Sequence, residues 1–257
     1  MIYAFLILCA FLIIEKRILQ KSRAKLGTVI NVNGIRGKTT TCRMLDAVLR
    51  ERYRVLTKTT GTDARILHTD GQDVPIKRIG AANIREQARA LRMAAREQAQ
   101  VAVLECMAVA PELQRISEEQ IVHADIAVIT NVRYDHMYEM GGSLENIASS
   151  LAGMIPRGGV VYTGDSAFFP FFEEQAERKG SRVVLCVPEA DENPNEVIVR
   201  AIAKDLGMAE AEIDAGLSNV QTDPGMEAQY RIHGTQGVFP FLNLFAANDP
   251  QSAMERL

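Results

Sequence analysis

The sequence has little that would place the protein in a specialised class. Only four of its 257 residues are cysteine, and they lie far apart in apolar surroundings, with no Cys-x-x-Cys pair and no cysteine–histidine cluster. A disulfide framework and structural zinc are therefore not indicated, and we expect buried thiols in a reducing compartment. The net charge of −3 argues against a general nucleic-acid binder, so no nucleic-acid partner is expected.

Long apolar runs are also scarce, apart from residues 2–14, which are uninterruptedly apolar and end at Glu15-Lys16-Arg17. About 20 apolar residues span a bilayer comfortably, so this run is short unless the bilayer thins. No positive side chain precedes it and no small-residue cleavage site follows it, which argues against a signal peptide. The basic residues after it favour a cytoplasmic location for the rest of the chain. We predict one N-terminal membrane helix that anchors a cytoplasmic catalytic domain in the cell membrane; the alternative is a buried N-terminal helix.

Residues 28–41, Thr-Val-Ile-Asn-Val-Asn-Gly-Ile-Arg-Gly-Lys-Thr-Thr-Thr, carry the strongest functional signal. An apolar strand pattern runs into a glycine loop, and a helical pattern follows at once. This order suits a phosphate site, because glycines let amide groups turn toward an anion and the helix N-terminus adds its positive dipole. Lys38 would reach the β- and γ-phosphates and Thr39 would hold Mg²⁺. Val32 replaces the first glycine of the common P-loop motif, and the alternative is an ordinary glycine-rich turn with a solvated lysine.

The rest of the chain alternates strand and helix patterns. We predict strands at 29–32, 53–57, 101–104, 126–129, 160–162 and 183–185, and helices at 39–52, 83–98 and 144–154. Continuously apolar strands between helices indicate an α/β fold with a mostly parallel sheet buried on both faces. Ligands of such sheets bind beyond the carboxyl ends of the strands, where Lys38, Glu105, Asn131 and Asp165 are placed.

Three segments are predicted from these patterns: a membrane anchor and basic linker at 1–26, an ATP-binding domain at 27–225, and the start of a truncated C-terminal domain at 226–257. Residues 229–233 and 237–242 resemble the two strands of a hairpin. About 30 residues are too few to bury a core, which favours truncation.

Four arginines recur along one predicted helix, at Arg85, Arg89, Arg92 and Arg96. A charge run of this kind is usually a solvated helix face. The alternative is a binding surface for an acidic substrate or polymer.

Two further groups of polar residues follow predicted strands. A carboxylate at Glu105 is costly to bury unless it is paired or bound to a metal, so Glu105 is a candidate Mg²⁺ ligand or a strand-end cap for a neighbouring helix. The second group is Thr130-Asn131-Val-Arg-Tyr-Asp135-His136, and Ser143 after it is placed to cap the next helix.

Together, the segment Gly34–Thr40, Glu105 and the segment Thr130–His136 resemble the Mur ligase superfamily, which includes the cell-wall amino-acid ligases and folylpolyglutamate synthetase. The resemblance covers roughly residues 28–165 and implies a Mur-ligase-like central ATPase domain. Within that group the chain resembles the ATP-binding ligase subunits of capsular poly-γ-glutamate synthases, which start with a membrane anchor and lack a UDP-binding domain. Residues Ile147–Ala152 lack the lysine that many members carry in this helix, which puts the second metal site in doubt.

The resemblance implies an ATP-dependent ligase that adds glutamate to a γ-glutamyl polymer through an acyl-phosphate, beside integral-membrane subunits. It assigns catalysis to Lys38, Glu105 and His136, and Mg²⁺ binding to Thr39, Glu105 and His136. The residues implied to hold the ATP phosphates are Asn33, Gly34, Ile35, Arg36, Gly37, Lys38, Thr39 and Thr40, and those near the substrate are Thr62, Asn131 and Arg133. The alternatives are another Mur- or folylpolyglutamate-type ligase, or a membrane-associated P-loop ATPase without ligase activity.

Overall fold

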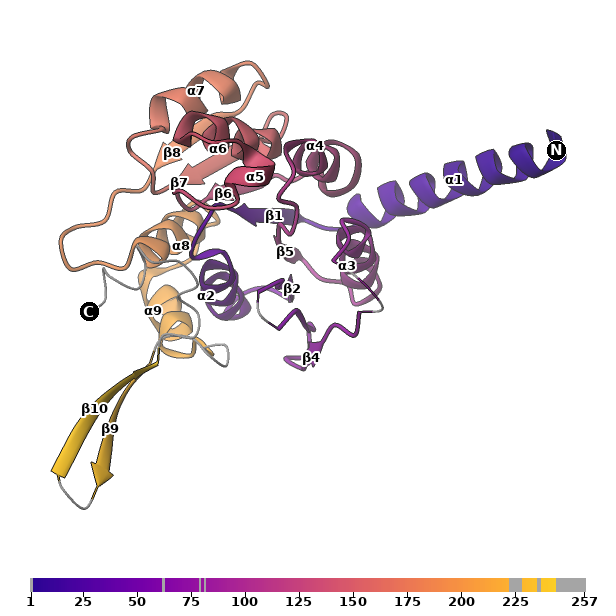
Figure 1. Ribbon diagram of the computed structural model, residues 1–257. Coiled ribbons are helices and arrows are strands. Elements are labelled where there is room, and N and C mark those ends of the chain that lie inside the picture. Colours follow the sequence, from indigo (N-terminus) through magenta and orange to yellow (C-terminus); the bar gives the residue numbers. More distant parts are fainter. Residues whose placement is uncertain are drawn as a thin grey trace. The chain divides into compact units, whose positions relative to one another are not determined.

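The computed structural model describes residues 2–61, 63–78, 80, 82–221, 228–234 and 237–243 (Figure 1). The chain divides into two compact units, Met1–Val220 and Gln221–Leu257. The first contains the sheet and its helices. In the second, β9 (Ala228–Gly234) and β10 (Gly237–Asn243) form an antiparallel hairpin, which confirms the hairpin predicted from the sequence. The Asn248-Asp249-Pro250 segment, which weakly resembles the motif that opens the C-terminal domain of the Mur ligase superfamily, lies outside the described residues.

The first unit is organised around an eight-stranded sheet with the order β4-β3-β2-β5-β1-β6-β7-β8. Its parallel strands are β1 (Thr28–Asn33), β2 (Val55–Lys58), β5 (Val101–Glu105), β6 (Ile126–Ile129), β7 (Val160–Thr163) and β8 (Arg182–Leu185). At one edge, β3 (Arg65–Leu67) and β4 (Asp73–Pro75) add antiparallel strands. The predicted mostly parallel α/β fold is confirmed. The chain crosses from β5 to β6 over β1, so the carboxyl end of β1 lies at a topological switch point.

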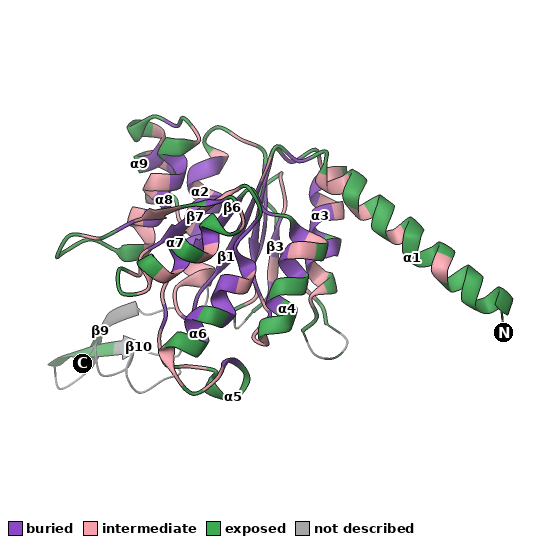
Figure 2. Ribbon diagram, turned by 90° about the horizontal axis from the view of Figure 1, so that it is seen from above, coloured by how far each residue is buried: buried purple, intermediate pink, exposed green. Residues whose placement is uncertain are grey.

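Helices cover both faces of the sheet (Figure 2). One face packs against α2 (Lys38–Arg50), α8 (Pro194–Asp205) and α9 (Glu210–Ser218). The other packs against α3 (Arg85–Arg96), α4 (Pro111–Ile116), the π-helical turn η1 (Ser117–Val122), α6 (Leu144–Leu151), the 3₁₀ turn η2 (Ala152–Met154) and α7 (Phe169–Glu177). The short α5 (Met137–Met140) precedes α6.

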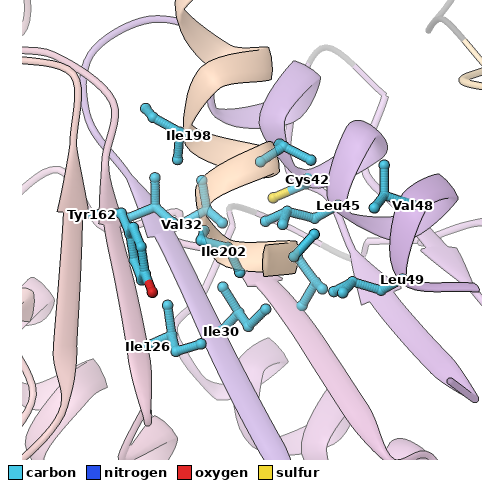
Figure 3. Close-up of a cluster of buried hydrophobic side chains, with 14 of the residues drawn as sticks. Ile30, Val32, Cys42, Leu45, Val48, Leu49, Ile126, Tyr162, Ile198 and Ile202 are labelled. Atoms are coloured by element: carbon cyan, nitrogen blue, oxygen red, sulfur yellow. The ribbon is translucent and has the colours of Figure 1, made fainter. Parts of the chain in front are cut away.

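A fully buried apolar cluster fixes α2 and α8 on the sheet (Figure 3). Leu45 of α2 and Ile202 of α8 meet Ile30 of β1, and all three are 0% exposed. Burying an aliphatic side chain of this size contributes about 1.5–3 kcal/mol. This packing holds the first turn of α2 against the end of β1, and so fixes the loop between them.

The predicted cap at Ser143 is confirmed at the N-terminus of α6, whereas the N-cap of α3 is Ile84 and Asn83 forms a local turn just before it. Ser143 Oγ accepts a hydrogen bond from Asn146 N at 3.3 Å, and Asn83 Oδ1 accepts one from Arg85 N at 2.9 Å. Cys42, Cys106 and Cys186 are buried free thiols as expected, whereas Cys9 is half-exposed.

The N-terminal apolar run forms part of α1 (Ile2–Arg23), but the prediction of a membrane-spanning helix is wrong. Among the described residues, no helix is long and apolar enough to cross a membrane. The apolar part ends at Glu15-Lys16-Arg17. It would span only about 20 Å, against about 30 Å of bilayer hydrocarbon. The alternative of a buried helix also fails, because nearly all its apolar side chains are exposed; only its last turns pack on the domain, through Leu19.

Candidate active site

The loop between β1 and α2 has two glycines at positive φ. Gly34 has a φ of 122°, and a Cβ there would lie 2.1 Å from Thr130 Oγ1. Gly37 has a φ of 83°, and a Cβ there would lie 2.5 Å from Asn195 Oδ1. A side chain at either position would strain the backbone, and at Gly34 it would also overlap the Thr130 backbone N at 2.8 Å, whereas at Gly37 it would displace the end of the Asn195 side chain. The two glycines of the motif are therefore needed for the fold of the loop itself.

The end of β6 holds this loop in place. Asn131 accepts hydrogen bonds from Ile35 N at 3.2 Å and from Arg36 N at 3.0 Å, and its amide donates to Arg36 O at 3.0 Å. Thr130 Oγ1 donates to the same carbonyl at 2.6 Å. Asn131, predicted near the substrate, is thus bonded to the loop backbone. The amides of Ile35 and Arg36 are engaged, whereas the first amides of α2 have no acceptor within the helix.

The side chains of Asn33 and Lys38 are also bonded locally. Asn33 is buried and donates to Gln114 Oε1 at 2.8 Å, beneath the sheet rather than into the loop. Lys38 Nζ donates to Gly34 O at 2.8 Å and to Ile35 O at 3.1 Å. Burial lowers the pKa of Lys38 because it disfavours the ammonium ion, and the nearby Glu105 charge acts in the opposite direction.

Glu105, the last residue of β5, is 2% exposed. Thr39 Oγ1 lies 3.1 Å and 3.0 Å from its two carboxylate oxygens, and Thr60 N donates to Oε2 at 2.7 Å. The structure therefore brings together Lys38, Thr39 and Glu105 from the ends of two adjacent strands, as the sequence predicted for this sheet edge.

Asp135 and His136 reach the loop by a different route. Asp135 pairs with Arg36 of the loop at 3.0 Å, while His136 has a φ of 50° and its Nε2 lies 3.8 Å from Asp135 Oδ2. Among the described residues, His136 makes no hydrogen bond or ion pair with Thr39 or Glu105. Within the described part of the chain, no three His, Cys, Asp or Glu side chains are close enough together to hold a metal.

The remaining predicted site residues are Asp165, Arg133 and Thr62. Asp165 accepts from Val132 N at 2.8 Å and so fixes the segment after β6. Arg133 is half-buried, and Thr62 lies outside the described residues.

Sequence reasoning missed two residues of this edge. Lys58 ends β2 and is fully buried, with its Nζ 3.6 Å from Glu86 and 3.8 Å from Met107 Sδ. Asn195, in the first turn of α8, packs against Gly37 and accepts from Thr41 Oγ1 at 3.3 Å. A polar residue after a strand is the signal that points to Lys58. No local signal points to Asn195, because it lies far from the loop in sequence.

Comparison with known families settles the classification. The family model of the Mur ligase middle domain matches residues 32–248. The chain belongs to the Mur ligase family. This Mur ligase chain is 35% identical to the capsule biosynthesis protein CapB of Bacillus anthracis, covering 99% of the chain and 59% of that protein. It is also 35% identical to the PGA synthase CapB of Bacillus subtilis, covering 98% of the chain and 69% of that protein. The chain thus spans about three fifths of the first relative's length.

Solved structures share the fold of this chain. E. coli FolC in complex with ADP superposes with a TM-score of 0.64 at 20% identity, over 81% of this chain and 62% of FolC. MurF from Acinetobacter baumannii superposes with a TM-score of 0.68 at 18% identity, over 90% of this chain and 52% of MurF. At these identities the likeness supports the architecture of the Mur ligase domain.

Proposed function

We propose that the protein is an ATP-dependent amide ligase that adds glutamate to a poly-γ-glutamate chain. The observation that carries this is the group Lys38, Thr39 and Glu105 at the glycine loop of a Mur ligase domain. Support for the substrate comes from the relatives, which are named as capsule biosynthesis and PGA synthase proteins.

The reaction proceeds in two steps. A carboxylate oxygen of the acceptor attacks the γ-phosphorus of ATP, and the bond to ADP breaks, which leaves an acyl-phosphate. The amine of glutamate then attacks the acyl carbon, the C–O bond to phosphate breaks, and the amine loses a proton as the amide forms. Such phosphoryl transfer depends mainly on positioning and on neutralising charge.

Lys38 and the first turn of α2 position the phosphates in this scheme. The amides of Gly37, Lys38, Thr39 and Thr40 lie at the N-terminus of α2, where an anion is favoured. Lys38 exchanges its two loop carbonyls for phosphate oxygens, whose negative charge favours the ammonium ion that burial disfavours. Asn131 keeps the loop in shape through its bonds to Ile35 and Arg36.

The residues present fit a magnesium ion. Thr39 and Glu105 offer hard oxygen donors that already lie within 3.1 Å of one another, and Glu105 is a buried carboxylate. Bound there, Mg²⁺ would neutralise the charge of the phosphates. We assign Thr39 and Glu105 to this ion. His136 is proposed as a ligand of a second ion, and Arg133 and Thr62 as substrate contacts.

We also propose that the protein works beside integral-membrane subunits at the membrane. The support is α1, which is exposed along most of its length (Figure 2) and carries apolar side chains that are more than half exposed, including Phe5, Leu8 and Phe11. Deletion of residues 2–14 should release the protein from the membrane fraction of cells that express the partner subunits. Unchanged fractionation would remove the support for this role of α1.

Glutamate-dependent ATP turnover by the full-length protein with its partner subunits tests the proposal. Lys38→Ala should abolish turnover. Unchanged turnover would show that the phosphate site is wrongly assigned, and turnover that needs no glutamate would favour a P-loop ATPase without ligase activity. A screen of other amino acids and acceptors separates a poly-γ-glutamate ligase from another Mur-type enzyme.

A further inference from the structure

A cavity of about 360 Å³ beside the candidate active site is dominated by cations. Of the described side chains that line it, four are basic, Lys77, Arg78, Arg85 and Arg89, and one, Glu86, is acidic. Arg85 and Arg89 are four residues apart at the start of α3, so they lie one above the other on the same face of the helix.

The negative charges near this cavity are already neutralised. Glu86 pairs with Arg78 at 2.8 Å and with the buried Lys58 at 3.6 Å. Arg85, which is 70% exposed, pairs with Glu15 of α1 at 3.0 Å. No hydrogen bond or ion pair involves Lys77 or Arg89 among the described residues. The cavity therefore has an excess of positive charge, with two cations free to meet an anion.

The cavity lies at the same edge of the sheet as Glu105. Gln87, next to Glu86, donates from Nε2 to the backbone oxygen of Glu105 at 2.9 Å. Lys58, which contacts Glu86, ends β2, and β2 pairs directly with β5. Two short links therefore connect the wall of the cavity to the end of β5.

We propose that this cavity binds the carboxylates of an acidic acceptor chain. The inference rests on the proposed function and extends it, since a γ-linked glutamate chain carries a free carboxylate on every unit. A row of carboxylates near the end being extended needs cations beside the site, and Lys77 and Arg89 supply them. These contacts hold the acceptor without touching the reacting atoms, so they set acceptor affinity rather than the chemical step.

The test compares two variants of the full-length protein with its partners. Lys77→Ala/Arg89→Ala removes both free cations, and Arg96→Ala removes an exposed arginine of the same helix that does not line the cavity. With a γ-linked glutamate hexamer as acceptor, the double variant should raise the acceptor KM roughly tenfold, as expected for two exposed charge contacts. Its kcat and its KM for ATP should stay at wild-type values, and Arg96→Ala should behave as wild type.

A second measurement separates this inference from the proposed ligase activity. Binding of the hexamer is measured without ATP, against its methyl ester and against single-stranded DNA of equal charge. Binding should weaken with salt, disappear for the ester and fall in the double variant.

If the wild type ligates glutamate but the double variant matches Arg96→Ala in both assays, the cavity is not the acceptor site. Equal binding of DNA would also overturn it. If no glutamate is ligated yet the hexamer binds through Lys77 and Arg89, the proposed reaction fails and the acidic-chain site stands.

Discussion

Thr39 Oγ1 lies within 3.1 Å of both carboxylate oxygens of Glu105, which joins the first turn of α2 to the end of β5. This contact crosses between the strand that carries the glycine loop and its neighbour in the sheet. It places a hard-oxygen donor set at the N-terminus of a helix, where phosphate and a divalent cation are both favoured.

Glu105→Gln is expected to lower glutamate-dependent ATP turnover by about 10²–10³-fold, because a neutral amide neutralises no metal charge. The decisive measurement is turnover as a function of Mg²⁺ concentration, in which the variant should need far more Mg²⁺. Glu112→Gln, an exposed carboxylate at the start of α4, serves as the control and should match wild type. If the Mg²⁺ dependence of Glu105→Gln is unchanged, Glu105 does not bind the ion.

Gly34→Ala should destabilise the domain more than Gly71→Ala. Both glycines have positive φ, 122° and 89°, but a Cβ at Gly34 meets Thr130 whereas one at Gly71 meets nothing within 4 Å. Backbone strain alone costs about 1–2 kcal/mol of folding stability, and Gly71→Ala should show only this cost. Urea unfolding should show at least about 1 kcal/mol of further loss for Gly34→Ala. Equal losses would mean that the loop moves away from Thr130 at little cost.

The stability of the domain should fall as pH rises from about 5 to 7, because burial raises the pKa of Glu118 from 4.5 to about 7. In that window the folded state keeps a proton that the unfolded state has lost, so the free energy of unfolding decreases with pH. The loss is up to about 3 kcal/mol over the window, at about 1.4 kcal/mol per pH unit. Urea unfolding at several pH values measures it.

Glu118→Gln should remove most of this slope. Glu118 accepts from Asn31 Nδ2 at 2.9 Å and from Ala124 N at 2.7 Å. A glutamine at this position can still accept a hydrogen bond from Ala124 N. Its amide can also donate to Asn31 Oδ1 once the Asn31 amide turns over, and Asn31 Oδ1 has no hydrogen-bond partner among the described atoms. Glu173→Gln, on the exposed face of α7, is the control and should keep the wild-type slope. If the free energy of unfolding of Glu118→Gln still falls with pH as in wild type, another group causes the pH dependence.

Lys58→Met should leave the melting temperature unchanged or raise it. The lysine is fully buried, burial lowers its pKa, and Glu86 keeps its pair with Arg78 when Lys58 is removed. Replacing a buried ion pair by apolar side chains is often neutral or stabilising, and removing one partner is costly only when it leaves the other charge unpaired, which Arg78 prevents here. Thermal unfolding checks this, with Arg50→Met, which breaks the Asp46 pair and the bonds to the backbone of residues 67–69, as the destabilising comparison. A clear drop in melting temperature for Lys58→Met would show that its ion pair with Glu86 is needed for the fold.

Much of the fold could be predicted from local pattern. Continuous apolar strands can be buried only between helices, so the parallel sheet and the position of the glycine loop follow from the sequence alone. The start of α6 at Ser143 follows from short-range hydrogen bonding in the same way. The membrane helix predicted from residues 2–14 was wrong, because among the described residues no helix is long and apolar enough to cross a membrane.

The sequence by itself therefore determined which residues form the loop and which strand ends carry Lys38, Thr39 and Glu105. Only the tertiary structure decided how they are held. Asn131 bonds the loop from β6, Asn195 packs on it from α8, and Lys58 is buried against Glu86. The physical reason is that periodicity and capping act over a few residues, whereas these contacts depend on strand order and on the packing of helices far apart in the chain.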